Sequence, residues 1–405
     1  MRVCVVGSGG REHALADVLG RHHDVVVTPG NPGIPGSTAA GPEAIDADLF
    51  VIGPEAPLVD GLADRLRSAG RLVFGPGADG ARLEGSKAWM KELLVEAGVA
   101  TAAYGAFTDA VSAKAFLAGL EPPFVIKTDG LAAGKGVAIV PTRVEADECV
   151  DRYLSGEAFG EAGRTLVIEE YLDGDELSVF AACDGTAAVF MGAARDHKRI
   201  DDGDRGPNTG GMGAFSPVVE VDEALRRQVM DDAIVPTLAA LSRRGIDYRG
   251  FLFCGVMLCA DGPKVLEYNI RFGDPEAQVI LPRIETDLGA LLAEAAAGRL
   301  STEPRFSPDA AVTVVAASEG YPQAPRTGDV IEGLDRAAAV DGVTVYCAGV
   351  DRGADDRLVT AGGRVLAVTG RGRDLADART RAYEAVDQIE WKGMHVRRDI
   401  GGTTP

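Results

Sequence analysis

Long apolar runs are missing from this chain of 405 residues. No run approaches the roughly 20 residues that a membrane-spanning helix needs, so the sequence argues against a membrane protein. The first residues, Met1–Gly7, hold a very short apolar stretch, which is typical of a strand entering a glycine turn rather than of a signal peptide. We therefore expect a cytoplasmic protein without membrane partners.

Paired cysteines are missing as well. The six cysteines form no C-x-x-C pair, and most of them lie in apolar, strand-like runs. We expect buried free thiols in a reducing compartment. The histidines show no metal-ligand spacing and no G-x-S-x-G motif is present, so the sequence indicates neither a zinc site nor covalent enzyme catalysis.

Positive charge is scarce: 41 Lys and Arg face 61 Asp and Glu, a formal net charge of −20. This argues against a general nucleic-acid-binding surface, which needs clustered cations, but it permits a local basic pocket for a small phosphorylated ligand. Lysine is rarer still, with only eight residues, which are Lys87, Lys91, Lys114, Lys127, Lys135, Lys198, Lys264 and Lys392. In a chain that uses Arg as its default cation, these positions suggest a need for a compact point charge.

Apolar residues are sufficient for a sizeable core, at 46% of the chain, and the length corresponds to about two to four domains. The first 75 residues or so alternate strand and helix patterns, which predicts a parallel α/β sheet with ligand loops at the strand ends. We expect strands at 2–6, 24–28, 49–52 and 72–74, with helices at 12–19 and 58–68.

The middle of the chain mixes helices and antiparallel strands. The patterns predict helices at 86–97, 110–117, 144–154, 222–244 and 287–297, strands at 124–127, 137–140, 165–171, 251–259 and 264–269, and a hairpin within 176–194. The polar, glycine-rich segment 196–213 is long for a connection, and loops of that length are usually functional or disordered. From residue 310, β-like runs precede one helix at 374–389, so the fold class is α/β and α+β.

A glycine turn, Gly7-Ser8-Gly9-Gly10-Arg11-Glu12, follows the first strand and opens a helix. Backbone N–H groups at such a helix start bind phosphate well. The dinucleotide fingerprint G-x-G-x-x-G fails because position 12 is Glu, and the second strand ends without an acid for a ribose hydroxyl. A phosphate-bearing substrate is favoured over a purely structural turn, and a nicotinamide dehydrogenase is disfavoured.

A second glycine-rich turn connects the strands at 124–127 and 137–140. Lys127 ends the first strand, and Gly134-Lys135-Gly136 precedes the second. Small residues let backbone N–H groups approach phosphates, and Lys neutralises their charge. The Walker A spacing is not met, so we favour a strand–loop–strand phosphate clamp over a P-loop, with a solvated hairpin as the alternative.

Glu267 and Asn269 lie on one face of a predicted strand, because side chains alternate along a strand. Two oxygen ligands at this spacing suit Mg²⁺, which takes few protein ligands and completes its shell with nucleotide phosphates. A half-exposed strand would show the same pattern. Arg271 follows and can fork onto a carboxylate or phosphate. Asp196-His197-Lys198-Arg199 and Gly206–Gly213 suggest a ligand loop that orders on binding.

At these residues the chain resembles the ATP-grasp ligases, and among them the phosphoribosylamine–glycine ligases (glycinamide ribonucleotide synthetases). The resemblance runs from residue 1 to about residue 401. It rests on GSGGREHALA, PGNPG, GPEAPLV, LEGSKAWMK, VIKTDGLAAGKGV, DHKRIDDGDRGPNTGGMGAFSP and EYNIRFGDPEAQ. The blocks DHKR…GPNTGGMGA and RFGDPE are long enough to make a chance match improbable.

The resemblance implies an amino-terminal α/β domain (1–84), an ATP-grasp domain with a mobile lid (85–300, lid about 103–172) and a small β-rich carboxy-terminal domain (301–405). It implies Mg²⁺ or Mn²⁺ at Glu267 and Asn269. It implies ATP contacts from Lys87, Lys127, Gly134, Lys135, Gly136, Glu169, Glu170, Tyr171, Leu172 and Glu176. It implies substrate contacts from Gly9, Gly10, Arg11, Glu55, Asn208, Thr209, Gly210 and Asp274, with Arg271, Asp196 and Lys198 in catalysis.

The reaction that this resemblance implies is the ATP-dependent joining of glycine to 5-phosphoribosylamine through glycyl phosphate, in purine biosynthesis, by a monomer. The segment from Gly33 to Asp48 is shorter than the family pattern, apparently by a strand and a helix, which leaves the order of the first sheet open. A non-catalytic ATP-binding regulator and a carboxylase-type ATP-grasp enzyme are the other readings, since a fold alone does not define a substrate.

Overall fold

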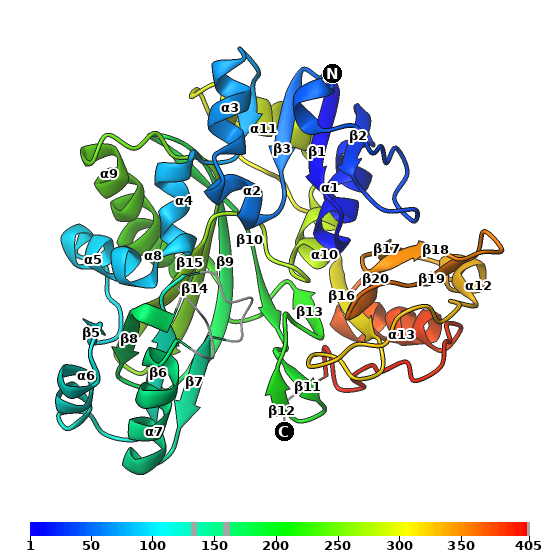
Figure 1. Cartoon of the computed structure of the whole chain (residues 1–405). Coiled ribbons are helices and arrows are strands. Elements are labelled where there is room, and N and C mark those ends of the chain that lie inside the picture. The colour runs from blue at the N-terminus through cyan, green and yellow to red at the C-terminus, as the bar shows by residue number, and fades with distance from the viewer. Residues whose placement is uncertain (131–135, 157–162, 403–405) are drawn as a thin grey trace.

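The computed structural model describes residues 1–130, 136–156 and 163–402 (Figure 1). Gly134 and Lys135 of the predicted phosphate clamp lie outside the described residues. Three groups of strands organise the chain: a four-stranded sheet at the amino terminus, a small four-stranded sheet, and an eight-stranded sheet that runs into the carboxy-terminal part. Two further pairs of strands form small hairpins.

The first sheet is parallel, and its strands are rich in buried Val, Ile and Phe, as expected of strands covered on both faces. The strands lie in the order β2 (Asp24–Pro29), β1 (Arg2–Gly7), β3 (Leu49–Ile52) and β4 (Val73–Phe74). The first crossover carries α1 (Gly10–Leu19). The order that the shortened segment left open is therefore β2-β1-β3-β4, and between β2 and β3 that segment forms a short 3₁₀ turn, η1 (Pro42–Ala44).

The helix predicted over 58–68 is wrong in its bounds. Two helices occupy this region, α2 (Glu55–Val59) and α3 (Leu62–Ser68). Gly61 separates them in the left-handed region, with a φ of 74°, which glycine adopts without steric cost. The break places Glu55 in the first turn of its own helix.

The small sheet has the order β5 (Tyr104–Phe107), β8 (Leu166–Glu169), β6 (Phe124–Thr128) and β7 (Val137–Val140). Two helices, α6 (Ala110–Leu117) and α7 (Arg143–Leu154), pack on it around Ile126, Tyr153 and Ile168. The predictions for α6, β6 and β7 are confirmed at or within one residue of their ends. In Figure 1 this unit projects from the rest of the molecule.

The eight-stranded sheet is antiparallel and continuous. Its order is β15 (Gly262–Asn269), β14 (Arg249–Cys259), β9 (Asp175–Asp184), β10 (Ala188–Asp196), β13 (Gly213–Ser216), β16 (Ala310–Ala317), β20 (Arg364–Gly372) and β17 (Val343–Cys347). The strand β13 pairs with β10 on one side and with β16 on the other. Hydrogen bonding therefore joins the middle of the chain to its carboxy-terminal part.

The segment 196–213 is not one irregular loop. It contains a hairpin of β11 (Arg199–Asp201) and β12 (Arg205–Asn208), with Asp204 in the turn at a φ of 51°. The helical stretch at 222–244 is α8 (Glu223–Val229), a π turn η3 (Met230–Ile234) and α9 (Val235–Arg243), and the π turn ends just before Pro236. Proline lacks an N–H and cannot donate a helical hydrogen bond, which accounts for the change of helix type at this position.

The remaining helices cover these sheets. They are α4 (Ala78–Gly85), α5 (Lys87–Ala97), α10 (Ala277–Ile280) with the turn η4 (Leu281–Arg283), α11 (Leu288–Ala296), α12 (Leu334–Ala338) and α13 (Leu375–Val386), and one more hairpin joins β18 (Val350–Arg352) to β19 (Leu358–Thr360). The cysteines are free thiols, as predicted, all buried except the half-buried Cys259. Among the described residues, no helix combines the length and the apolar character that crossing a bilayer requires.

Candidate active site

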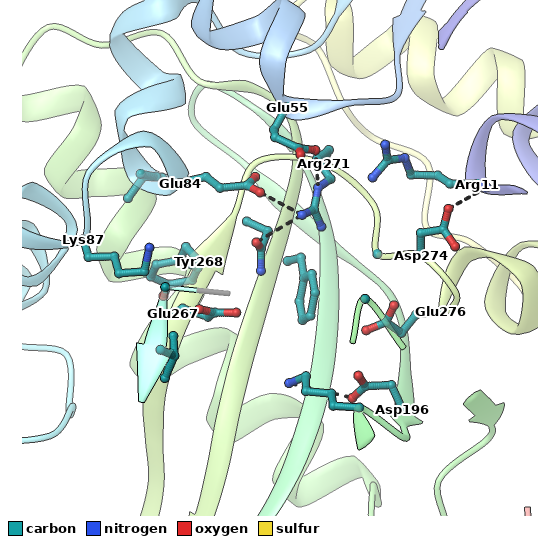
Figure 2. Close-up of a pocket in the computed structure, with 18 of the residues that line it drawn as sticks. Arg11, Glu55, Glu84, Lys87, Asp196, Glu267, Tyr268, Arg271, Asp274 and Glu276 are labelled. Carbon is teal, nitrogen blue, oxygen red and sulfur yellow. Dashed lines mark hydrogen bonds and ion pairs between the residues drawn. The ribbon is translucent and has the colours of Figure 1, made fainter. Parts of the chain in front are cut away.

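A cavity of about 350 Å³ opens where the first sheet, the small sheet and the eight-stranded sheet meet (Figure 2). Twelve of the residues that the sequence singled out line it: Arg11, Glu55, Lys87, Gly136, Asp196, Lys198, Thr209, Gly210, Glu267, Asn269, Arg271 and Asp274. These residues come from segments as far apart in sequence as α1 and the end of β15. The fold therefore gathers the separate motifs into one site.

One part of the site, which we call the lysine end, consists of Lys87, Lys91, Lys127 and Lys198 around the carboxylates of Glu169 and Glu267. Lys87 is the first residue of α5, whose amino terminus is capped by the Ser86 hydroxyl, which accepts from the N–H of Trp89 at 3.2 Å. Its Nζ donates to the carbonyl of Gly130 at 3.1 Å. Burial lowers the pKa of Lys87, although Glu267 opposes this shift.

Glu267 holds a formal charge in the middle of this group. Burial would raise the pKa of its carboxyl, but Lys198, Lys127 and Lys87 together bring the pKa below its usual value. Asn269 is buried two residues further along β15, and its Oδ1 accepts from Arg271 Nη2 at 3.4 Å. The predicted oxygen pair thus lies beside the lysines.

Glu267 and Asn269 can supply part of the ligand shell of a divalent cation. Within the described ranges, no group of three or more His, Cys, Asp and Glu side chains is placed to hold a metal ion. Mg²⁺ commonly binds through one or two carboxylates and completes its shell with water and substrate phosphates. Glu267 and Asn269 supply such a partial set of oxygen ligands, which would be complete only with a phosphorylated ligand present.

Lys198 extends the lysine end toward β9 and β10. Its Nζ forms a close ion pair with Glu176 and lies 3.9 Å from Asp196 Oδ1. Burial disfavours the ammonium, but Asp196 and Glu176 outweigh it and raise the pKa of Lys198. The same burial raises the pKa of Glu176. Glu176 does not line the cavity itself and reaches it through Lys198.

The segment 169–172, implied as the adenine-binding hinge, follows β8. Glu169 turns its side chain inward between Lys91 and Lys127. Glu170 pairs with Ala103, whose N–H it accepts at Oε1 at 3.0 Å. Tyr171 is exposed and Leu172 is buried. Neither these four residues nor Lys127 lines the cavity, so they adjoin it.

The opposite part of the site, which we call the arginine end, consists of Arg11, Arg271 and Arg364 around Glu55, Glu84 and Asp274. Arg271 bridges two carboxylates, with Nε 3.2 Å from Glu55 Oε2 and Nη2 2.7 Å from Glu84 Oε1 (Figure 2). Burial opposes the charge on Arg271, but Glu84 and Glu55 outweigh it and raise its pKa. Glu84, which also accepts the N–H of Ile270 at 2.9 Å, was not singled out in the sequence, although it lies in the quoted block LEGSKAWMK.

Asp274 joins this end to two distant segments. Its Oδ2 accepts the N–H of Arg11 at 3.3 Å, and its carbonyl accepts from Arg364 Nη1 at 2.7 Å. Burial would raise the pKa of Asp274, but Arg364 and Arg11 lower it. Arg364 also donates to the carbonyl of Gly210 at 2.6 Å. It lies on β20, outside every motif, so no local pattern could have identified it.

In the glycine turn before α1, a backbone amide that could bind a ligand is already bonded to a side chain of the protein. The N–H of Gly9 donates to Glu12 Oε2 at 2.6 Å, so this amide already has an acceptor. A Cβ on Gly10 would lie 2.6 Å from Gln278 Nε2, so a larger residue there would require the Gln278 side chain to move. Of the predicted residues Gly9, Gly10 and Arg11, only Arg11 lines the cavity. Asn208 likewise lies outside the lining, on β12, whereas Thr209 and Gly210 line it.

Glu276, which sequence reasoning did not single out, lines the cavity between the two ends. Its Oε1 accepts from the Ser178 hydroxyl at 3.2 Å. Burial, with a smaller contribution from Asp196, raises the pKa of Glu276 to about 7. A carboxyl that titrates near neutrality inside a cavity is typical of functional sites.

The small sheet and the eight-stranded sheet, with a cavity that Lys87 and Lys198 line, give the fold of an ATP-grasp protein. Family models agree along the chain: the phosphoribosylglycinamide synthetase N domain matches residues 1–84, its ATP-grasp (A) domain matches 85–277 and its C domain matches 311–403. The chain belongs to the phosphoribosylglycinamide synthetase family.

Curated relatives and solved structures support this membership. The chain is 48% identical to the phosphoribosylamine–glycine ligase of Caulobacter vibrioides, with 99% of this chain and 98% of the relative covered, and 45% identical to that of Leifsonia xyli, with 99% of each covered. The crystal structure of the Thermotoga maritima phosphoribosylamine–glycine ligase matches with a TM-score of 0.88 at 36% identity, over 98% of this chain and all of that one. A biotin carboxylase domain from Hydrogenobacter thermophilus, solved with MgADP, shares the fold at 17% identity, with a TM-score of 0.73 and 98% and 91% of the two chains covered.

Proposed function

We propose that the chain joins glycine to 5-phosphoribosylamine with ATP, giving glycinamide ribonucleotide, ADP and phosphate. The observation that carries this proposal is a single cavity with two chemically different ends. The lysine end suits the phosphates of a nucleotide, because Lys acts as a compact point charge. The arginine end suits a small substrate with anionic groups, because Arg forks hold carboxylates and phosphates in defined geometry.

The chemistry requires no activated side-chain nucleophile. The carboxylate of glycine attacks the γ-phosphorus of ATP, so one of its oxygens becomes bonded to phosphorus and ADP leaves. The amine of phosphoribosylamine then attacks the carbonyl carbon of glycyl phosphate, phosphate leaves with that oxygen, and the nitrogen loses a proton. The cost of the first step is mainly positioning and charge neutralisation at the transferred phosphoryl group.

The lysine end is proposed to provide that neutralisation. Lys87 and Lys127 contact the nucleotide phosphates, together with the turn Gly134-Lys135-Gly136. The backbone groups of residues 169–172 (Glu169, Glu170, Tyr171 and Leu172) border the adenine, and Glu176 binds the ribose. Glu267 and Asn269 hold Mg²⁺ or Mn²⁺, which when bound would supply a Lewis acid at the phosphates.

The arginine end is proposed to bind the two other substrates. Gly9, Gly10, Arg11, Glu55, Asn208, Thr209, Gly210 and Asp274 form the walls of this subsite. Arg271 of the arginine end, Lys198 of the lysine end and Asp196 act on the reacting groups. Arg271 is held by Glu55 and Glu84, so its position is set before substrate arrives.

Glycyl phosphate hydrolyses in water, so the site must close during turnover. We assign the closing lid to residues of about 103–172 within an ATP-grasp domain of 85–300, between a substrate domain of 1–84 and a carboxy-terminal domain of 301–405. A cytoplasmic monomer that uses only small-molecule substrates is the simplest assembly for this role.

Isotope transfer tests the mechanism. Glycine labelled with ¹⁸O in its carboxylate should yield inorganic phosphate that carries one ¹⁸O per turnover, measured by mass spectrometry, with ADP as the nucleotide product. Omitting either glycine or phosphoribosylamine should abolish net phosphate release. Unlabelled phosphate, or AMP with pyrophosphate, would overturn the glycyl phosphate mechanism.

A further inference from the structure

Glu169 lies between two lysines that come from different parts of the fold. Its Oε1 is 2.9 Å from Lys127 Nζ on β6, and its Oε2 is 3.0 Å from Lys91 Nζ on α5. The side chains of Lys91 and Glu169 are 0% and 2% exposed, and that of Lys127 is 8% exposed. The three groups together carry one net positive charge in a place that water scarcely reaches.

Lys91 is the member of this cluster that the proposed mechanism leaves without a role. Its Nζ also donates to Thr101 Oγ1 at 2.7 Å, and that hydroxyl donates to the carbonyl of Val265 at 2.6 Å. Burial lowers the pKa of Lys91 to about 8, although Glu169 opposes the shift. Burying an ammonium is unfavourable unless it is paired, and an apolar residue would fill the same volume at lower cost. The charge on Lys91 therefore calls for a reason beyond packing.

We propose that Lys91 is a positioning residue that neutralises Glu169 and so leaves the charge of Lys127 free for nucleotide phosphate. The proposal rests on the proposed function, in which Lys127 contacts ATP. In the structure the Lys127 ammonium faces the Glu169 carboxylate. A nucleotide phosphate must therefore compete with Glu169 for Lys127. When Lys127 turns to the phosphate, Glu169 keeps an ion pair with Lys91 and is not left buried and unpaired.

Without the Lys91 charge, Glu169 and Lys127 would form a neutral, buried pair. Withdrawing Lys127 from such a pair would leave a buried carboxylate without a partner, which strongly disfavours the change. Phosphate binding would then lose the net positive charge of the cluster. A purely structural Lys91 would instead affect the stability of the contact between α5 and β8 and would leave the affinity for ATP unchanged.

The test is a set of charge variants in the full chain, with the dissociation constant of MgATP measured by calorimetry and kcat measured separately. Lys91→Met, an apolar residue of similar length, should raise the Kd for ATP about tenfold while kcat at saturating ATP stays within about twofold. The double variant Lys91→Met/Glu169→Gln should recover affinity to within about threefold of the parent, because Lys127 regains its free charge. Lys114→Met is the matched control, since Lys114 pairs with the exposed Asp151 on the same small-sheet unit.

An unchanged Kd in folded Lys91→Met, a loss of kcat without a change in Kd, or a double variant no tighter than the single one would overturn the proposal. If Lys91→Met does not fold, Glu169→Gln decides: a Kd at or below the parent value supports competition for Lys127, and a tenfold rise refutes it. Lys127→Ala separates the two hypotheses. Normal ATP affinity in that variant would refute the proposed phosphate role of Lys127, whereas weak affinity there with normal affinity in Lys91→Met would refute the role of Lys91 alone.

Discussion

The two ends of the cavity hold their cations in different ways. At the arginine end, Arg271 is bound by two carboxylates and Arg364 by backbone carbonyls, so their positions are set by the protein. At the lysine end, Lys87 Nζ donates to the backbone carbonyl of Gly130, and burial lowers the pKa of this lysine. Two lysines, Lys91 and Lys127, share the single carboxylate of Glu169.

This difference suggests a division of labour. Cations that already have carboxylate partners make a rigid wall that orients a substrate, because moving them would break buried ion pairs. Lys87, Lys91 and Lys127 have fewer carboxylate partners than the paired Lys198 and keep positive charge for a ligand that supplies several negative groups, such as a triphosphate. The chain uses Arg where the cation is held rigidly by the protein and Lys where the charge is kept for a ligand, although Arg is its more common cation.

The largest expected effect is at Glu267, the carboxylate whose pKa Lys198, Lys127 and Lys87 lower. Glu267→Gln removes the formal charge proposed to hold the metal, so kcat should fall by about 100-fold or more and the Mg²⁺ requirement should rise. The measurement is ADP release over a Mg²⁺ titration. Glu223→Gln, on the exposed face of α8, is the control. A titration that overlays the parent would show that Glu267 is only a strand residue.

A smaller effect is expected at Lys127. Lys127→Ala should lower kcat/KM for ATP by about 10- to 100-fold, because one phosphate partner is lost, while the circular dichroism spectrum stays that of the parent. Lys114→Ala, on the same unit, should behave as the parent. Unchanged kcat/KM in the purified Lys127 variant would contradict the proposed phosphate contact.

At the arginine end, the shape of the cation should matter as well as its charge. Arg271→Lys keeps the charge but cannot bridge Glu55 and Glu84, so the free energy of unfolding should fall by about 1–3 kcal/mol and kcat by about tenfold. Urea denaturation gives the first quantity. If Arg271→Lys is as stable and as active as the parent, the arginine end is not a rigid wall.

The smallest effect concerns pH and Glu276. Burial and Asp196 raise the pKa of this carboxyl from 4.5 to about 7, so the folded protein binds the proton more tightly than the unfolded chain. Stability should therefore fall as the pH rises from about 4.5 through about 7. Glu276→Gln cannot ionise, so its stability relative to the parent should increase as the pH rises from 5 to 8. Thermal unfolding across this range measures it.

Asp274, two residues earlier, provides the opposite case. Arg364 and Arg11 outweigh burial and lower the pKa of Asp274, so its contribution to stability is present at neutral pH and disappears as the pH falls through its folded-state pKa. Asp274→Asn should therefore destabilise the protein at pH 7 and less so in acid. Parallel curves for the parent and both variants would contradict the assignment of these two environments.

The sequence by itself determined the local elements and the chemistry of the motifs. Short apolar runs predicted β6 and β7, and the alternation of polar and apolar residues placed Glu267 and Asn269 on one face of β15. These patterns also placed Lys127 and the Glu267/Asn269 pair at or near strand ends. The rarity of Lys pointed to the lysine end. The family followed from motifs too long to arise by chance, and the comparisons agree.

Only the tertiary structure decided which of these charged groups meet. Arg364 reaches Gly210 from a strand more than 150 positions away, Glu84 completes the fork on Arg271, and Glu169 brings Lys91 and Lys127 together. Such contacts have no sequence period, because they depend on how separate elements pack. The shifted pKa of Glu276 is of the same kind, since burial and the nearness of Asp196 arise only when the chain is folded.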